Sequence, residues 1–196
     1  MIGWMNNWQY AADVPTSPWR GQMTVPRDLK LAGGPGGLRL IEEPIAELKQ
    51  LRKTHIALNA NERRELDTDT FELASVITTG KASELGWRLL AADGTFTLVG
   101  YDREKRQLFV DRTHSGDTRF SKYFPIRTNA PLEIGDGKLR LHILVDRSSI
   151  EVFAQDGRIA MTNLVFPPRN ARGIEFYSKG ETGPVEAELW TLGSIW

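Results

Sequence analysis

The stretch LRLHILVDRSSIEVFAQDGRIAMTNLVFP, residues 139–167, decides the fold of this chain. In its first part apolar and polar residues alternate, which is the period-two pattern of a strand that buries one face. The pattern resumes from Ile150 to Ala154, and Asp156-Gly157 then predicts a two-residue hairpin turn, because both residues tolerate positive φ angles. A third strand, Arg158 to Phe166, ends at Pro167-Pro168, since proline cannot donate to the strand ladder. The stretch therefore predicts a β-meander at the centre of an all-β domain.

Three polar residues of this stretch, Asp146, Ser148 and Glu151, have the spacing D-x-S-x-x-E and suggest catalysis. A catalytic role requires a cleft and a carboxyl group with a shifted pKa. Asp and Ser also bond readily to the backbone of tight turns, and Arg147 can pair locally, so we favour a structural role. The segment DRTHSG, residues 111–116, holds Asp, His and Ser too close in sequence for a catalytic triad and predicts a turn.

The flanking sequence continues the pattern of strands and turns. Strand-like runs occur at about residues 55–60, 71–78, 87–91, 95–101, 107–112, 173–178 and 185–192. Tight turns are expected at Ala92-Asp93-Gly94 and Gly135-Asp136-Gly137. Since no helical segment separates these strands, we predict an antiparallel β-sandwich, concanavalin- or lectin-like, over residues 54–196.

The N-terminal part of the chain has a different character. Residues 2–5 read as the second half of a buried strand, so we expect a partner strand to be missing before them. Other strands are expected to end near Tyr10 and to cover residues 22–31 and 38–41. Residues 44–51 form the only good helix candidate, because Pro44 suits a first turn and apolar residues recur at three-residue steps. We expect this helix to bridge two structural units.

Composition and charge exclude several classes of function. Lys and Arg total 25, as do Asp and Glu, so no net charge attracts nucleic acid or an anionic membrane. No apolar run approaches the roughly 20 residues of a membrane span, and no signal peptide is visible. There is no cysteine, and His55, His114 and His142 lack the spacing of metal ligands. We predict no metal, no cofactor, no nucleic-acid partner and no membrane partner; the sequence does not determine the compartment.

Six segments, in order along the chain, resemble the C-terminal part of glycoside hydrolase family 32, the levanases, inulinases and β-fructofuranosidases (invertases). They are GWMNNWQYA (3–11), PTSPWRGQMTVPRDLKL (15–31), KASELGWRL (81–89), LFVDRTHSG (108–116), LVDRSSIEVFAQDGR (144–158) and LGSIW (192–196). The resemblance implies a five-bladed β-propeller that carries the active site, joined by a linker to a β-sandwich. Residues 1–44 would then be a remnant of the last blade, residues 45–53 a helical linker and residues 54–196 the sandwich.

The same resemblance implies hydrolysis of fructosyl bonds in fructans or sucrose with retention, which needs a nucleophilic and an acid/base carboxyl group about 5 Å apart. The family carries these groups and a stabilising Asp in WMNDPNG-like, EC and RDP motifs. This chain has none of the three: Asn7 stands where the first motif has its nucleophile, and Leu29 follows Arg27-Asp28 in place of Pro. We therefore expect a truncated enzyme portion that lacks the catalytic carboxylates and is inactive alone.

The resemblance also points to Trp8 and Trp4 as substrate-binding residues, because the last blade contributes a Trp beside the fructosyl pocket and aromatic rings stack on sugars. The alternative for both is packing between strands. Asn6 and Asn7 are candidate donors to sugar hydroxyls, although such side chains often bond turn backbone instead. Other residues are expected to be structural: Trp87, Trp190 and Trp196 in the core or against the sheets, and residues 62–65 in a solvated loop.

Two functions from different classes follow. The first is the C-terminal portion of a fructan- or sucrose-hydrolysing glycosidase, whose partners are its carbohydrate substrate and the missing N-terminal propeller. The alternative is a stand-alone, non-catalytic sandwich that binds carbohydrate or holds an assembly together. In addition, uncovered strand edges in about the first 40 residues predict self-association, aggregation or poor order of that part.

Overall fold

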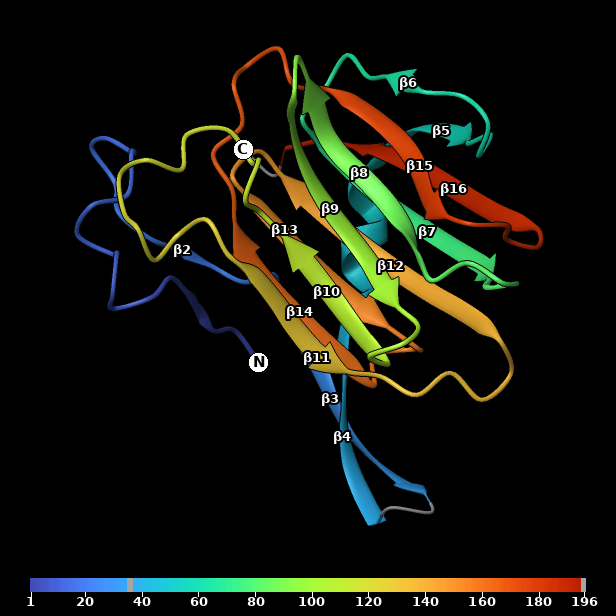
Figure 1. Cartoon of the computed structure of the whole chain (residues 1–196). Helices are drawn as coiled ribbons and strands as arrows, with labels where there is room; N and C mark the ends of the chain where they lie inside the picture. Colours follow the sequence, from blue (N-terminus) through green and yellow to red (C-terminus); the bar gives the residue numbers. More distant parts are fainter. Residues whose placement is uncertain (35–36, 195–196) are drawn as a thin grey trace.

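The computed structural model describes residues 1–34 and 37–194, and their main body is a sandwich of two six-stranded antiparallel sheets (Figure 1). The first sheet has the order β11-β10-β9-β8-β15-β6 and the second β14-β13-β12-β7-β16-β5. The strands of the first are β6 (Arg64–Glu65), β8 (Glu84–Ala92), β9 (Thr95–Asp102), β10 (Gln107–Asp111), β11 (Arg127–Pro131) and β15 (Gly173–Lys179). Those of the second are β5 (Arg52–Ala57), β7 (Thr70–Thr78), β12 (Lys138–Asp146), β13 (Ser149–Ala154), β14 (Ile159–Leu164) and β16 (Val185–Leu192). The predicted all-β sandwich is confirmed.

The core lies between the two sheets, where alternate residues of each strand point inward. Trp87 of β8 is fully buried there, and its indole N–H donates to Ser75 Oγ over 3.1 Å, so the polar atom of the ring is satisfied. Trp190 alternates with the buried Leu189 and is half-buried on the outer side of the sandwich, under the guanidinium of Arg52. Both tryptophans therefore have the structural roles expected of them, whereas Trp196 lies outside the described residues.

The predicted meander exists and forms one half of its sheet, from the edge to the middle, so only part of it has the predicted central place. Strands β12, β13 and β14 pair in sequence; β14 is the edge strand, and β12 lies beside β7 at the middle of the sheet. Strand β7 pairs with both β12 and β16, which come from distant parts of the sequence. The alternation of apolar residues identifies a strand with one buried face, but it does not say which neighbours the strand acquires.

The predicted two-residue turn after β13 was also wrong. Four residues separate Ala154 from Ile159, and Gln155, Asp156 and Gly157 all have positive φ. The Gln155 side chain closes this loop by accepting from the N–H of Arg140 and donating to the Lys138 carbonyl. The loop also meets the N-terminal part of the chain, because the N–H of Glu42 donates to the Gly157 carbonyl over 2.9 Å. Tertiary contacts therefore set the length of this turn.

Three further expectations need correction. The helix candidate is a 3-10 helix, η1 (Ala46–Leu51), and Pro44 belongs to the preceding strand. The expected strand over residues 22–31 is interrupted before Arg27, because Pro26 has no N–H to donate. Strand β11 was not predicted, and the expected loop over residues 62–65 contains the short, exposed strand β6.

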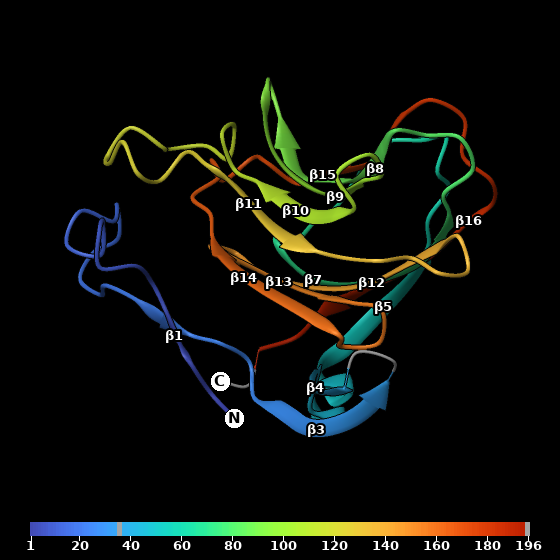
Figure 2. The same cartoon turned by 60° about the horizontal axis from the view of Figure 1, so that its bottom comes forward.

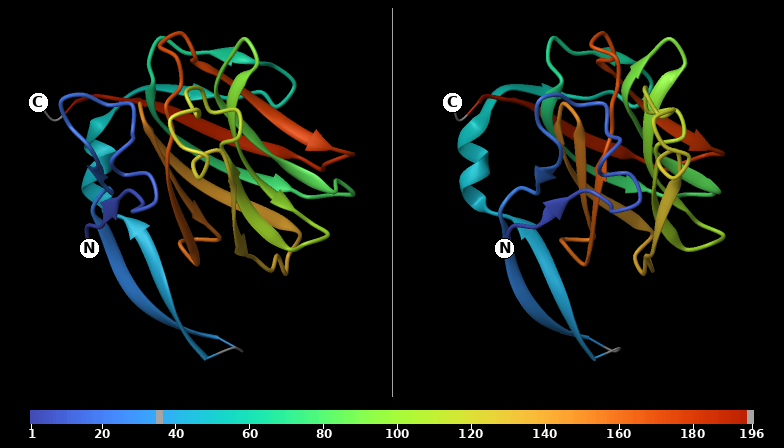
Figure 3. Two further views of the ribbon diagram at one scale, coloured as in Figure 1. Left: turned by 60° about the vertical axis from the view of Figure 1, so that its left-hand side comes forward. Right: turned by 90° about the vertical axis from the view of Figure 1, so that its left-hand side faces the viewer.

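The N-terminal residues form two small sheets beside the sandwich (Figures 2 and 3). Strand β1 (Trp4–Met5) pairs with β2 (Gln22–Met23), and β3 (Arg27–Gly34) pairs with β4 (Gly37–Pro44) in a ribbon that projects from the molecule. A second cluster of buried apolar residues attaches the β1–β2 part to the sandwich: Met5, Tyr10, Val14, Phe124 and Leu164. The N-terminal segment is thus packed on the sandwich, while the β3–β4 ribbon extends into solvent.

Candidate functional site

The candidate site is an exposed pair of aromatic rings in the N-terminal segment. Trp8 is 88% exposed and Trp4 is 46% exposed, and their ring centroids lie 5.1 Å apart at an interplanar angle of 52°. Neither ring is buried between strands, so the packing alternative does not describe them. Two neighbouring rings that present apolar faces to solvent are suited to stack on the apolar face of a sugar.

The backbone around these rings is fixed by local hydrogen bonds. The Asn7 carbonyl accepts from the N–H groups of Tyr10 and Ala11, at 3.1 and 2.8 Å, which makes one helical turn after Trp8. The side-chain oxygen of Asn7 accepts from the Gln9 N–H, and that of Asn6 accepts from the Asn7 N–H. Both amide oxygens therefore bond turn backbone. The Asn6 Nδ2 group is buried and makes no hydrogen bond within the described residues.

Gly21 allows Trp4 to occupy its position. This glycine has a φ of +95°, and a Cβ added to it would lie 2.9 Å from Trp4 Nε1. A side chain at residue 21 would thus displace the indole. The sequence PWRGQ places this glycine directly before β2, the strand that pairs with β1, so the aromatic pair depends on both sides of the small sheet.

The sandwich holds the turn after Trp8 through Tyr10. The Tyr10 hydroxyl accepts from Nη1 of the buried Arg112 over 3.2 Å, and its ring packs edge-on against Phe124 at 5.4 Å. Arg112 belongs to the segment 111–116, which forms a turn, as predicted: Asp111 accepts from the backbone and hydroxyl of Thr113. His114 stacks on Phe96 and takes no part in a triad. The segment therefore positions the N-terminal residues.

Two of the three D-x-S-x-x-E residues, Ser148 and Glu151, join the N-terminal segment to the sandwich. Arg27 Nη2 donates to Glu151 Oε2 over 2.5 Å, and the Val25 N–H donates to Glu151 Oε1 over 2.7 Å. Gln22 Nε2 donates to Ser148 Oγ, so Ser148 bonds a distant side chain, and the expectation that it bonds turn backbone was wrong. Burial raises the pKa of Glu151, and the bonds from Val25 and Arg27 oppose this. The predicted structural role is therefore correct for Glu151, with a partner that the sequence did not indicate.

A second ionic group lies in a groove between η1, the β3–β4 ribbon and the outer face of the second sheet. Glu72 accepts from Arg52 through both carboxylate oxygens, at 2.7 Å each, and lies 2.7 Å from His142 Nε2. Burial alone would raise the pKa of Glu72, but the bonds from Arg52 and His142 outweigh it and lower that pKa to about 2. Arg52 and Glu72 satisfy each other's charge, which fits a structural tie between β5 and β7.

The Glu72 group predicts a loss of stability in acid. The pKa is about 2 in the folded chain against an ordinary value of 4.5, so the unfolded chain binds the proton more tightly. The carboxylate stabilises the fold above pH 4.5, by up to about 3 kcal/mol, and this contribution disappears as the pH falls toward 2. In urea unfolding, Glu72→Gln should be less stable than the parent chain at pH 7, and its free energy of unfolding should change less between pH 4.5 and 2. The exposed Glu188→Gln, which also loses a pairing with histidine, should change little; equal effects of the two variants would contradict the prediction.

The described residues contain no group of three His, Cys, Asp or Glu side chains that could hold a metal ion. None of the described helices is long and apolar enough to span a membrane.

The polar contacts of the junction were missed by sequence reasoning. Arg27 lies 124 residues from Glu151 and 135 residues from Thr162 in the sequence. No local pattern marks such a pair.

Comparison with known protein families places residues 1–191 in one family. Residues 45–191 match the family described as "Glycosyl hydrolases family 32 C terminal", and residues 1–44 match "Glycosyl hydrolases family 32 N-terminal domain". The boundary between the two matches falls at the end of β4, directly before η1.

Individual relatives agree with this match. The chain is 39% identical to the levanase of Bacillus subtilis over 202 residues, which cover 97% of this chain and 30% of the levanase. It is 36% identical to the extracellular exo-inulinase of Aspergillus awamori over 208 residues, which cover 39% of that protein. The crystal structure of the exo-inulinase from Aspergillus awamori superimposes on all of this chain with a TM-score of 0.91 at 34% identity. The superimposed part is 40% of the exo-inulinase chain. The chain thus spans less than half the length of these relatives.

Proposed function

The chain belongs to glycosyl hydrolase family 32, and from this premise we propose that it forms the C-terminal portion of a β-fructosidase-type enzyme that hydrolyses fructans or sucrose with retention. In this proposal residues 1–44 complete the last propeller blade, residues 45–53 link the two domains, and residues 54–196 form the accessory sandwich. The relatives are a levanase and an exo-inulinase, which supports a fructan as the substrate class.

The exposed pair Trp4 and Trp8 carries the proposal, as a wall of the sugar subsite. The Trp8 ring is 88% exposed, so its apolar surface is in contact with water, and stacking on a fructosyl ring would remove that surface from water. Asn6 contributes its Nδ2 group, a buried amide donor that makes no hydrogen bond within the described part of the chain. Asn7 acts indirectly in this proposal, because its amide oxygen holds the turn that presents Trp8.

In this proposal the carboxylates of this chain do not supply the catalytic pair. Retaining hydrolysis needs one carboxylate to form the glycosyl ester and a second carboxyl group to protonate the leaving oxygen. Beside the N-terminal segment, Glu151 and Glu42 both accept from Arg27, at 2.5 and 2.8 Å, and are committed to the junction. In the proposed enzyme the catalytic carboxylates come from the propeller, and the chain contributes binding and support.

A chimera tests this proposal. In it, the chain replaces the matching segment of the Bacillus subtilis levanase, to which it aligns over 202 residues. We expect the isolated chain to release no fructose from levan, inulin or sucrose, and we expect the chimera to release fructose from levan. An inactive but folded chimera, or fructose release by the isolated chain, would contradict the proposal.

The β3–β4 ribbon supports the propeller as the missing partner. Its register places Leu29, Leu31, Leu38 and Leu40 on one face, and Asp28, Lys30, Arg39 and Glu43 on the other. Leu31 is 70% exposed and Leu38 is 75% exposed, an arrangement that a two-stranded ribbon does not sustain in water without a cover. We propose that the remaining propeller strands cover this leucine face.

The leucine face predicts self-association of the isolated chain. Leu31→Thr combined with Leu38→Thr should shift the chain toward monomer in sedimentation velocity, because the change removes the apolar face and keeps the propensity for strand. The matched control, Lys30→Thr with Arg39→Thr, changes the opposite face of the same ribbon and should leave association in place. A monomeric parent chain at all concentrations would refute the prediction.

A stand-alone carbohydrate-binding or assembly module is the alternative. The sandwich favours it in one respect, since its two sheets enclose a continuous core of their own. In this case the isolated chain should bind levan or inulin in a titration, and replacing Trp8 in the chimera should not change its release of fructose. Absence of binding at millimolar sugar would count against the module.

A further inference from the structure

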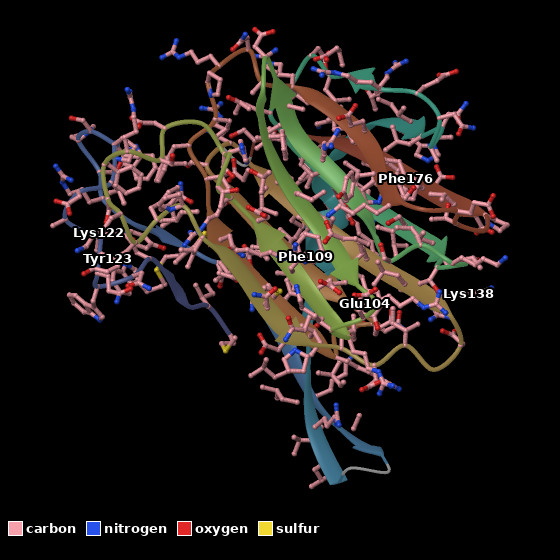
Figure 4. All side chains as sticks on the ribbon, viewed as in Figure 1. Glu104, Phe109, Lys122, Tyr123, Lys138 and Phe176 are labelled. Atoms are coloured by element: carbon pink, nitrogen blue, oxygen red, sulfur yellow. The ribbon has the colours of Figure 1, made fainter. Side chains whose placement is uncertain are left out.

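A polar groove on the flank of the sandwich lies apart from the aromatic pair and from the junction. It opens where β15 and β16 approach the loop after β5, and Figure 4 marks Phe176 on this flank. Its lining comes from three segments and one isolated side chain: residues 58–61, residues 176–178, residues 182–185 and Arg88. We propose that this groove binds a neutral saccharide and, resting on the function proposed above, that the saccharide is a stretch of fructan chain.

The edge of the first sheet is open along this groove. Strand β15 pairs with β8 over most of its length, but β6 pairs only with Gly173 and Ile174 of β15. Within the described part of the chain no strand covers residues 175–179 on that side. Backbone N–H and C=O groups at an uncovered edge are hydrogen-bonding groups that a hydroxylated ligand can satisfy.

The side chains of the groove are mostly neutral hydrogen-bonding groups. Asn59 uses its amide oxygen on the Asn61 N–H, which leaves the Asn59 NH₂ group and the whole Asn61 amide without a bond to described residues. Ser178 and Thr182 add hydroxyl groups. The only charged side chain in the lining, Arg88, pairs with Glu175 at 2.8 Å, so the groove does not select a charged ligand.

Aromatic rings complete the pattern and are held rigidly. Phe176 packs edge-on against Trp87 with ring centroids 5.4 Å apart. The Tyr177 hydroxyl donates to Glu84 over 3.1 Å, and the Arg88 guanidinium lies 4.9 Å from the Tyr177 ring centroid. Fixed rings beside amides and hydroxyls match the apolar faces and the hydroxyl groups of an uncharged sugar. The groove at η1, in contrast, is lined by charges that pair with one another, including Arg52 and Glu72.

Titration of levan- and inulin-derived oligosaccharides into the ¹⁵N-labelled chain tests this site. We expect chemical-shift changes at the amides of residues 58–61 and 176–178. Tyr177→Ala should weaken this binding on the order of tenfold, and Tyr177→Phe should keep it, because the ring carries the contact. Tyr123→Ala is the matched control: this tyrosine is 45% exposed, lies outside the groove and appears away from Phe176 in Figure 4. It should leave the binding unchanged.

The exposed Asn61→Ala provides a second variant if Tyr177→Ala does not fold, and it should also weaken the binding. Absence of shifts in both lining segments at saturating sugar would overturn the proposal, as would equal losses for Tyr177→Ala and Tyr123→Ala. Shifts in the groove that persist in Trp8→Ala establish this site independently of the aromatic pair. Shifts confined to residues 4–8 would support the proposed function and refute the groove.

Discussion

Replacing Trp8 by alanine in the levanase chimera should lower kcat/KM for levan by about 10- to 100-fold, which corresponds to about 1.4 to 2.8 kcal/mol. Among the described aromatic rings the indole contacts only Trp4, and it is 88% exposed, so its removal costs the fold little. The free energy lost is the part of substrate binding that comes from covering the apolar surface of the Trp8 indole with the fructosyl ring. Steady-state kinetics on levan, with the melting temperature of each variant, measure the two effects separately.

Trp19→Ala is the matched control for that experiment. Trp19 is another tryptophan of the N-terminal segment, is 44% exposed, and lines a different hollow, beside Gln22 and Asp146. Its removal should change kcat/KM far less than that of Trp8. If Trp8→Ala leaves kcat/KM unchanged, or if both variants reduce it equally, the aromatic pair is not a wall of the subsite.

Much of the sandwich could be predicted because the rule that generates it is local. Strand β16 was expected at residues 185–192 and spans Val185–Leu192, since its alternate residues face the core and solvent. Trp87 is buried in a strand, β8, in which every residue except Arg88 is buried. Strand β6 has only two residues and both are exposed, so it gives no periodic signal. The position of the meander at an edge depends on pairings across the whole chain, which a local pattern does not contain.

The residues of the candidate site were proposed from the sequence, but their bonding was not predictable. Trp4 and Trp8 came from the family resemblance, and their proximity and exposure became apparent only in the structure. Asn6 and Asn7 were candidates for donating to sugar or for bonding turn backbone, and their amide oxygens accept from nearby N–H groups of the turn. Sequence could not decide this, because the same short amide side chain serves either partner and the choice depends on backbone conformation.

The junction between Arg27 and Glu151 predicts the largest effect on stability. Both side chains are buried, and Glu151→Ala would remove one of the two carboxylates that pair with Arg27 and leave the Val25 N–H without its acceptor. Breaking a buried pair from one side costs about 3 to 5 kcal/mol, because the remaining charge stays out of water. Chemical denaturation should show this loss, and hydrogen exchange should show faster opening of residues 1–25 than of the core strands.

Two comparisons separate the charge pair from a general loss of packing. Glu43→Ala removes an exposed partner of Lys30 on the same ribbon and should change stability little. The double variant Arg27→Met with Glu151→Met replaces both charges by apolar side chains and should recover much of the loss, since neither charge then remains buried and unpaired. If the double variant is as unstable as Glu151→Ala, the junction acts through its shape and its bonds to Val25 and Thr162. Recovery would instead identify the buried ion pair as the group that fixes the N-terminal segment, and with it Trp8, against the sandwich.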